Sequence, residues 1–228
     1  MRSLHRGFTL VELLLAVAVI GLLLAILLPS LGAAQGAARC SACLSQMRQI
    51  GSATLLYAHA NKGRLPRSSH SALAAHVMPW GYALVPSITG ERYLGPGPDW
   101  DNLFNDLYRC PNDPRTDKWS YGKNVWFELS SGETGELLGQ ANGPTYETLC
   151  HIPNHHRTIL FGELASGSMG DHIMAHFWNM GGAPEVDMKR HSGQSNYVFI
   201  DGHAETLEFN TTFDLAAKID LWDPGKAR

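Results

Sequence analysis

Hydrophobic residues are concentrated in one run near the start of the chain. From Phe8 to Leu28 nearly every position is apolar, and the run contains a single carboxylate, Glu12. This length matches the ~20 residues that a helix needs to cross a bilayer. Arg2 and Arg6 precede the run, and no acid does. That charge bias predicts a cytoplasmic N-terminus, with the rest of the chain on the other side of the membrane.

Beyond Pro29 the apolar residues become a stripe at helical spacing. The stripe and its flanking positions are Cys43, Met47, Ile50, Thr54 and Tyr57, with Leu44, Gly51, Leu55 and Ala58 beside them; the opposite face carries Ser45, Arg48, Gln49 and Ser52. This pattern is typical of a helix that lays one face on a core, and Gly63 is a natural stop. We therefore expect one stem helix, with residues 8–29 as its membrane-spanning part and residues 30–63 as its amphipathic continuation.

Residues 64–228 are numerous enough to form one domain with its own core. Stretches rich in β-branched and aromatic residues predict strands, and Asp201-Gly202 is a preferred two-residue hairpin turn. The expected strands are residues 119–127, 158–163, 196–200 and 204–209; the expected short helices are 71–77 and 103–108, and residues 129–145 form an exposed excursion. The predicted fold is α+β, a long N-terminal helical stem packed on a small antiparallel sheet with long loops.

The segment Gly7-Phe8-Thr9-Leu10-Val11-Glu12-Leu13 resembles the processing site of type IV prepilins and type II secretion pseudopilins. The resemblance implies that prepilin peptidase removes a leader, residues 1–7, after Gly7 and that Phe8 is then N-methylated. Glu12 becomes the fifth mature residue, one helical turn from the new ammonium group, and the two charges can neutralise each other. Paired between neighbouring subunits, they would set the register of a helical fibre.

The same run has two other interpretations. A cleaved secretory signal also has a basic start and an apolar core, and the small residues between Gly32 and Ala38 could hold its cleavage site. A plain membrane anchor could tolerate one acid near its end. Under the preferred interpretation the protein is a single-pass inner-membrane protein with a periplasmic or extracellular head. Its partners would be prepilin peptidase, identical or related subunits, the inner-membrane assembly platform and the lipid bilayer.

A second resemblance lies in the C-terminal third. His191, nine intervening residues and then Asp201-Gly202-His203 resemble the His-x9-Asp-Gly element of a large prepilin-like subfamily. Three further segments match that subfamily: Cys110-Pro111, Ser120-Tyr121-Gly122-x-Asn124 and Ile159-Leu160-Phe161-Gly162-Glu163. Because the biochemical role of the subfamily is poorly defined, the resemblance implies an architecture better than an activity.

The sequence offers two candidate metal sites, and the spacing demands neither. His191, Asp201, His203 and Glu163 are plausible ligands for a divalent metal. The simpler explanation is structural: Asp201-Gly202 serves the hairpin, His191 is a hydrogen-bonded buried histidine, and Glu163 pairs with Arg190 or Lys189. A calcium site is weakly indicated by a cluster of oxygen ligands that lacks the loop glycine of the helix-loop-helix pattern; its members are Asp99, Asp101, Asn102, Asn105 and Asp106. No other cofactor is expected.

The four cysteines are Cys40, Cys43, Cys110 and Cys150. A head outside the cytoplasm permits disulfides, and the pair Cys110–Cys150 is the preferred candidate. Free buried thiols are nearly as well supported, because connectivity cannot be read from one sequence.

Composition narrows the function classes. The formal net charge is −3, and no basic face indicates a nucleic-acid partner. Nucleophile-elbow, phosphate-loop and dinucleotide motifs are absent from the sequence, so we do not expect an enzyme. We expect a structural subunit of a type II secretion pseudopilus or a type IV pilus-like fibre. The alternatives are a minor or tip subunit that binds a surface, a sugar or a secreted cargo, and a membrane-tethered metal-binding enzyme. The binding loops would be those around Trp80, Tyr82, Tyr93 and Trp100.

Overall fold

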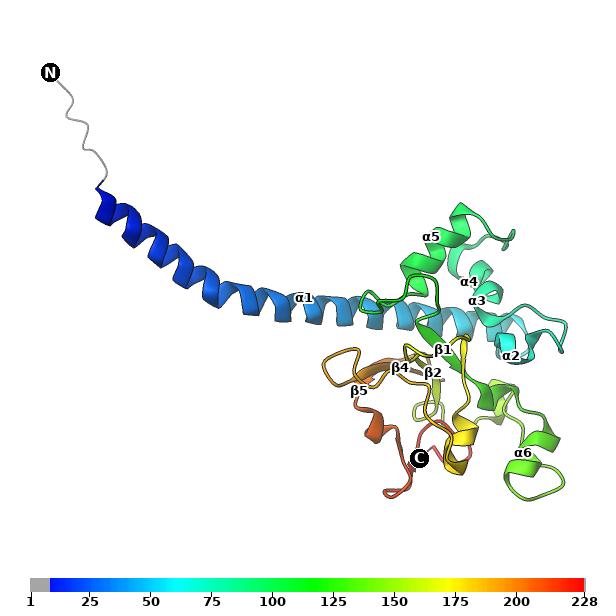
Figure 1. Cartoon of the computed structure of the whole chain (residues 1–228). Helices are drawn as coiled ribbons and strands as arrows, with labels where there is room; N and C mark the ends of the chain where they lie inside the picture. The colour runs from blue at the N-terminus through cyan, green and yellow to red at the C-terminus, as the bar shows by residue number, and fades with distance from the viewer. Residues whose placement is uncertain (1–8, 228) are drawn as a thin grey trace. The chain divides into compact units, whose positions relative to one another are not determined.

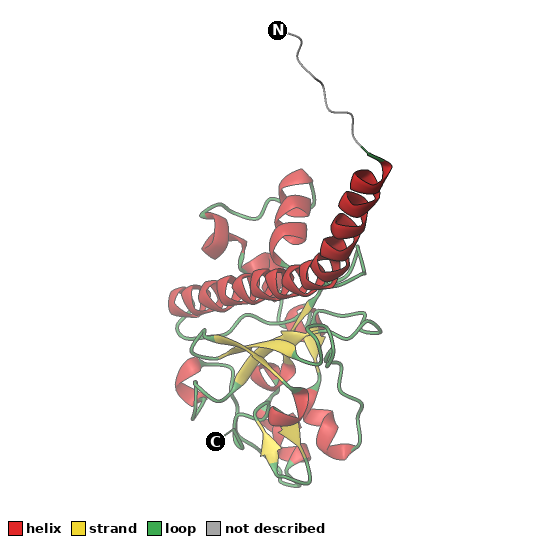
Figure 2. Cartoon of the chain, turned by 90° about the vertical axis from the view of Figure 1, so that its left-hand side faces the viewer, coloured by secondary structure: helices red, strands yellow, loops and turns green. Residues whose placement is uncertain are grey.

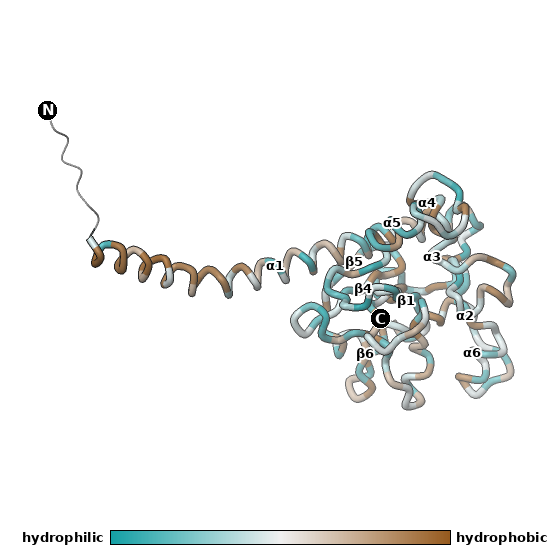
Figure 3. The backbone as a smooth tube through the Cα atoms, turned by 45° about the horizontal axis from the view of Figure 1, so that its top comes forward, coloured by the Kyte–Doolittle hydropathy of each residue, from teal (hydrophilic) through white to brown (hydrophobic). Residues whose placement is uncertain are grey.

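The computed structural model describes residues 9–227. Its first element is one long helix, α1, Leu10–Ala60, with Pro29 inside it. The chain divides into two units at Ala38 and Arg39, within this helix. All side chains of residues 9–38 are exposed, and they are mostly apolar as far as Leu31 (Figure 3). The predicted division of the stem at residue 30, between a membrane-spanning part and an amphipathic continuation, stays a prediction.

The head part of α1 buries the predicted stripe. Its buried positions are Cys43, Met47, Ile50, Gly51, Ala53, Thr54 and Ala58, while Arg48, Gln49 and Ser52 are exposed. The helix ends as expected, because Lys62 (φ 58°) and Gly63 (φ 81°) turn into the left-handed region. The Gly63 N–H then donates to the Ala58 carbonyl at 2.8 Å, which satisfies a terminal carbonyl in the usual way.

The head contains a five-stranded sheet of order β3-β1-β2-β4-β5, shown in Figure 2. Its strands are β1 (Tyr121–Asn124), β2 (Ile159–Glu163), β3 (His172–Ile173), β4 (Ser195–Phe199) and β5 (Ala204–Leu207). The pairs β1–β2, β2–β4 and β4–β5 are antiparallel, but β3 runs parallel to β1. The predicted α+β architecture is confirmed, and the sheet is antiparallel apart from the short parallel pairing of β3 with β1. A separate two-stranded sheet joins β6 (Phe213–Asp214) to β7 (Ile219–Asp220).

Strands β1, β2 and β4 are buried along their whole length. In Figures 1 and 2 the head part of α1 lies between the sheet and a group of three short helices, α3 (Trp80–Ala83), α4 (Val85–Thr89) and α5 (Pro98–Leu107). The short elements of the head are α2 (Ser69–Ala72), α3 (Trp80–Ala83), α4 (Val85–Thr89), α5 (Pro98–Leu107), α6 (Ser131–Leu137), η1 (Val125–Glu128), η2 (Leu149–His151), η3 (Ala175–Met180) and η4 (Phe209–Thr211).

Three local expectations need correction. The strand predicted over residues 119–127 stops at Asn124, because the Asn124 side chain accepts the Trp126 N–H at 3.1 Å and caps the 3-10 segment η1. The turn at Asp201-Gly202 is longer than two residues: the last ladder pair is Val198–Ala204, and only Gly202 has positive φ. Residues 129–145 contain α6, which begins with a capping box between Ser130 and Glu133.

Candidate functional site

The first candidate region is the start of α1. Gly7 and Phe8, the predicted processing residues, lie outside the described residues. Glu12 is bonded within its own chain, since its Oε2 accepts the Thr9 N–H at 2.8 Å and the Thr9 hydroxyl at 2.7 Å. The Glu12 N–H donates back to Thr9 Oγ1 at 3.2 Å. This reciprocal pattern is a capping box, which stabilises the first turn of a helix.

The apolar face of this segment has no partner within the described chain. Leu10 is 75% exposed and Val19, the least exposed large apolar residue of the segment, is still 49% exposed. The helix is long and apolar enough to cross a membrane by length and composition. Removing such side chains from water is favourable by roughly 25 cal/mol per Å² of apolar surface. The segment therefore fits membrane anchoring.

The second candidate region is a buried cluster in the head. It joins Cys43 of α1, Cys110 after α5, Glu163 at the end of β2 and His191 before β4. The ligand atoms of all four lie within 4.8 Å of one another. The Cys43 thiol donates to Glu163 Oε1 at 3.0 Å, and His191 Nε2 lies 3.0 Å from the same oxygen. Cys110 Sγ is 3.6 Å from His191 Nε2.

The surrounding residues hold these groups in place. The second carboxylate oxygen of Glu163, Oε2, accepts the Asn196 N–H at 2.8 Å and the Ser195 hydroxyl at 3.2 Å, so Oε1 points at the thiols. Arg190 lies 3.8 Å from Oε1 and also pairs with Asp113 at 3.4 Å and Asp187 at 3.0 Å. Because Oε2 of Glu163 is held by Ser195 and Asn196, the direction of Oε1 is fixed toward Cys43 and His191.

The neighbours of His191 favour its protonated form. Burial alone would lower the pKa of His191, but its hydrogen bonds to Cys110 and Glu163 and their charges raise it to about 10. The hydrogen bond from Cys43 and that from His191 lower the pKa of the Cys110 thiol to about 7, against the opposing effect of burial. Burial, together with Cys110 and Glu163, raises the pKa of Cys43. His191 thus lies between a carboxylate and the more acidic of the two thiols.

The predicted set of four metal ligands does not converge. Glu163 and His191 lie in the buried cluster, whereas Asp201 and His203 lie with His156 in a second, more exposed group. The reason is the length of β4: Glu163 is bonded to the start of this strand, and Asp201 follows its far end, about 3.3 Å further per residue. The alternative in which Glu163 pairs with Arg190 agrees with the structure, where the Arg190 guanidinium lies 3.8 Å from Glu163 Oε1.

The exposed group has structural explanations of its own. Asp201 Oδ1 accepts the His203 N–H at 3.1 Å, and Oδ2 is 3.1 Å from His156 Nδ1. His203 stacks on Phe199, with ring centroids 4.2 Å apart and planes at 7°. These contacts close the β4–β5 loop.

The predicted Cys110–Cys150 disulfide is not formed in the structure, where all four cysteines are free. Cys110 is buried, whereas Cys150 is exposed and lies 3.5 Å from the Thr148 hydroxyl. The partner that the sequence interpretation missed is Cys43. The position of Cys43 on the buried stripe of α1 was predicted, but its proximity to Cys110, Glu163 and His191 was not.

The weakly indicated calcium ligands lie along α5 rather than in a loop. Asp99, Asp101, Asn102, Asn105 and Asp106 are exposed, and the Asn105 side chain is used to donate to the Asp101 carbonyl at 2.7 Å. A regular helix does not wrap its side chains around one ion as a calcium loop does. This arrangement gives no support to the calcium interpretation.

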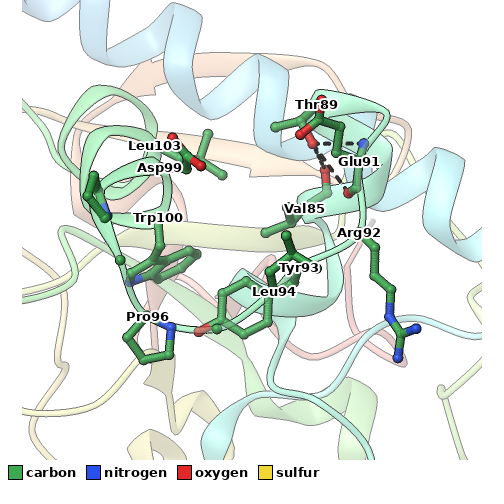
Figure 4. Close-up of a pocket in the computed structure, with 13 residues that line it drawn as sticks. Val85, Thr89, Glu91, Arg92, Tyr93, Leu94, Pro96, Asp99, Trp100 and Leu103 are labelled. Atoms are coloured by element: carbon green, nitrogen blue, oxygen red, sulfur yellow. Dashed lines mark hydrogen bonds between the residues drawn. The ribbon is translucent and has the colours of Figure 1, made fainter.

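The aromatic residues proposed for a binding surface pack mainly on one another. Trp80 is fully buried, and Tyr82, Tyr93 and Trp100 are half-buried. The Tyr82 ring lies 4.5 Å from Trp100 and 4.9 Å from Tyr93. A shallow pocket opens beside them, with the rings of Tyr93 and Trp100 in its wall and the Arg92 side chain pointing away (Figure 4).

Comparison with known proteins gives one match. The family model described as the prokaryotic N-terminal methylation motif matches residues 2–28. No curated protein and no solved structure matches the chain. The match covers the predicted processing site, Glu12 and the apolar run, and it is consistent with a pilin-like or pseudopilin-like protein. The C-terminal His-x9-Asp-Gly resemblance lies outside it and stays a prediction.

Proposed function

We propose that this chain, which carries the N-terminal methylation motif typical of type IV pilins and pseudopilins, is a structural subunit of a type II secretion pseudopilus or a type IV pilus-like fibre. Prepilin peptidase cuts after Gly7, and Phe8 becomes the methylated N-terminus. Before assembly, the mature protein is anchored in the inner membrane with its head on the periplasmic or extracellular side. It then joins a bundle of α1 helices from identical or related subunits.

The observation that carries the proposal is the match of the methylation motif to residues 2–28, continuous with a helix whose apolar side chains are exposed up to Leu31. Such a surface needs either lipid or neighbouring helices around it. Moving from the bilayer into a helical bundle exchanges one apolar surrounding for another. The same segment can therefore serve as an anchor before assembly and as a fibre core afterwards.

Glu12 has two roles to separate in this proposal. Within one chain it caps the helix through Thr9. In a fibre its charge would pair with the Phe8 ammonium of a neighbouring subunit, which fixes the axial register. Glu12→Gln keeps an acceptor for Thr9 but removes the charge, whereas Glu12→Ala removes both.

The test expresses wild-type, Glu12→Gln and Glu12→Ala proteins in the native host. The N-terminal peptide is identified by mass spectrometry, insertion is measured by membrane fractionation, and assembly is measured as the amount of subunit in sheared or cross-linked fibres. We expect all three to start at N-methylated Phe8 and to be inserted. We expect both variants to be depleted from the fibre fraction.

Each outcome has a defined meaning. A wild-type peptide starting between Gly32 and Ala38 would refute the proposal and leave a secreted domain. Depletion of Glu12→Ala alone would make Glu12 a helix cap and not a charge partner. Ser30→Ala is the matched control, because among residues 9–227 the Ser30 hydroxyl bonds only to the Leu27 carbonyl of its own helix, at 2.8 Å; it should assemble normally.

A binding role for a minor or tip subunit is less well supported. The aromatic residues that would form the contact surface stack on each other, so little of their area is free for a partner. We propose that they stabilise the loops around α3–α5.

A further inference from the structure

We propose that Cys43, Cys110, Glu163 and His191 form a closed, structural zinc site inside the head. The match to the methylation motif does not bear on this site, because all four residues lie outside residues 2–28. The proposal therefore stands or falls independently of the role in a fibre.

The donor set points to zinc. Two thiolates, one imidazole and one carboxylate are all regular zinc ligands, and soft thiolates disfavour calcium and magnesium. Four protein ligands without an open position are typical of structural sites, whereas catalytic sites keep one position for water. All four side chains are buried, so water is not a ready fifth ligand.

The geometry is close to what the ion requires. Bonds of about 2.0–2.3 Å in a tetrahedron place ligand atoms about 3.3–3.8 Å apart. The separation of Cys110 Sγ from His191 Nε2 is 3.6 Å, and Glu163 Oε1 lies 3.0 Å from both Cys43 Sγ and His191 Nε2. Shifts of well under 1 Å along these edges would admit the ion.

The outer contacts orient the ligands as in other zinc sites, where hydrogen bonds to the far side of each ligand fix its direction. Glu163 Oε2 is held by Ser195 and Asn196. The Asn112 N–H donates to Cys110 Sγ at 3.4 Å, and the Asn112 carboxamide lies 3.2 Å from His191 Nδ1. The amide nitrogen Nδ2 faces Nδ1 in the structure. Turning the carboxamide over would place its oxygen there to accept a hydrogen bond from Nδ1–H, which leaves Nε2 free for the metal.

Charge is balanced when the ion is bound. Two thiolates and a carboxylate then bring three negative charges into a buried space, where uncompensated charge is costly. Arg190, 3.8 Å from Glu163, offsets part of this charge. A divalent ion offsets the remainder. On binding, the ion displaces the thiol protons and the proton between His191 and Glu163, so uptake must release protons.

The main competing arrangement is a Cys43–Cys110 disulfide, which would form if the two sulfur atoms closed to about 2.05 Å. A disulfide would not explain why the side chains of His191 and Glu163 converge on the same point as the two thiols. A zinc site uses all four groups and also protects the thiols outside the cytoplasm. Plain hydrogen bonding of free thiols is the other alternative.

The experiment uses the full-length protein purified in detergent. It is incubated with ZnCl₂, washed through a desalting column and measured for metal by elemental analysis; a parallel sample is loaded with Co²⁺ for absorption spectroscopy. We expect one ion per chain and the visible bands of a tetrahedral cobalt site with thiolate ligands. Cys110→Ser and Glu163→Gln should weaken binding on the order of 100-fold. Cys150→Ser, which alters an exposed cysteine, should bind like the wild type.

Several results would overturn the proposal. These are absence of retained metal in the wild type, a Cys43–Cys110 disulfide in the non-reduced peptide map, or metal that survives Cys110→Ser but is lost in His156→Ala. A measurement without variants guards against misfolding: alkylation of Cys43 and Cys110 in the wild type should quicken roughly tenfold when a chelator is added, while Cys150 reacts unchanged. Equal rates with and without chelator would also refute the site.

Discussion

The buried ion pair between Lys123 and Glu128 gives the sharpest test of what holds the head together. The Lys123 ammonium lies 2.7 Å from Glu128 Oε1, and the two side chains are 0% and 1% exposed. Lys123 Nζ has this carboxylate as its single hydrogen-bond partner among the described residues. Glu128 has more support, because the Ser68 N–H and the hydroxyls of Ser68 and Ser71 also donate to it, at 2.8, 2.9 and 2.6 Å.

This asymmetry predicts unequal costs. Breaking a buried pair by removing one partner costs about 3–5 kcal/mol. Lys123→Met should fall near the low end, since three donors still stabilise the Glu128 carboxylate. Glu128→Gln should fall near the high end at pH 7, because the ammonium is left unpaired. Lys123→Met/Glu128→Gln removes both charges and keeps an acceptor for the serines. We expect its cost to be about 2 kcal/mol less than the sum of the single variants.

The pH dependence supplies a second signature. Burial lowers the pKa of Lys123, and Glu128 opposes this effect by its charge and hydrogen bond. Without Glu128 that opposition disappears, so the lysine pKa in the folded state falls further below its unfolded value. A base that binds protons more weakly when folded gains stability as pH rises between these two values. Glu128→Gln should therefore recover stability relative to the wild type between pH 7 and pH 9.

The assay is urea unfolding of full-length protein in detergent, followed by tryptophan fluorescence. All six tryptophans lie in the head, at positions 80, 100, 119, 126, 178 and 222, so the signal excludes the membrane segment. Lys118→Met is the matched control: Lys118 is 3.5 Å from Asp117 in a pair that is 33% and 75% exposed, and it should change stability by less than about 0.5 kcal/mol. Additive single variants, within that margin, would refute the proposed coupling.

Two further predictions use the same assay. Burial would raise the pKa of Asp113, but hydrogen bonds from Arg115 lower it to about 2 from 3.8. The stabilising effect of this carboxylate should be present above pH 3.8 and be lost toward pH 2, so the stability advantage of the wild type over Asp113→Asn should shrink by about 2 kcal/mol over that range. Parallel pH profiles of the two proteins would contradict this. Gly51→Ala should destabilise by about 1–2 kcal/mol, because its Cβ would lie 2.7 Å from Val198 Cγ1. Gly132→Ala, where a Cβ meets nothing within 4 Å, should be neutral or stabilising, and equal effects of the two substitutions would show that packing is not the cause.

Elements with a repeating pattern of apolar residues were predictable, because the spacing of those residues identifies the buried face of a helix or strand. The stripe from Cys43 to Ala58, the stop at Gly63 and the strands β2, β4 and β5 all follow from local spacing. The missed helix α6 also had a local signal, since Ser130 and Glu133 stand at capping-box spacing before an apolar pair. The parallel pairing of β3 with β1 had none, because a two-residue strand carries too few positions to show a period.

The buried cluster is a different kind of feature, because tertiary structure alone brings its members together. Cys43 is 120 residues from Glu163, and Cys110 is 81 residues from His191. The sequence interpretation started from the His-x9-Asp-Gly element and therefore grouped Asp201 and His203 with His191. A hairpin, however, carries its tip away from the start of its first strand. The ligand that was missed, Cys43, was assigned to the core for its helical position.

That position gives the cluster a structural meaning. Cys43 lies one turn inside the part of α1 that belongs to the head, which begins at Arg39. Hydrophobic contacts along a helix tolerate small slides and rotations, because they are not directional. A metal ligand at Cys43 would be directional and would fix both the rotation and the axial position of the helix on the sheet. For a subunit whose helix continues into a fibre core, that restraint would set how the head is presented. Loss of the ion should therefore loosen the contact of α1 with β2 and β4 first, which hydrogen exchange at residues 43–58 would detect as faster opening in the presence of a chelator.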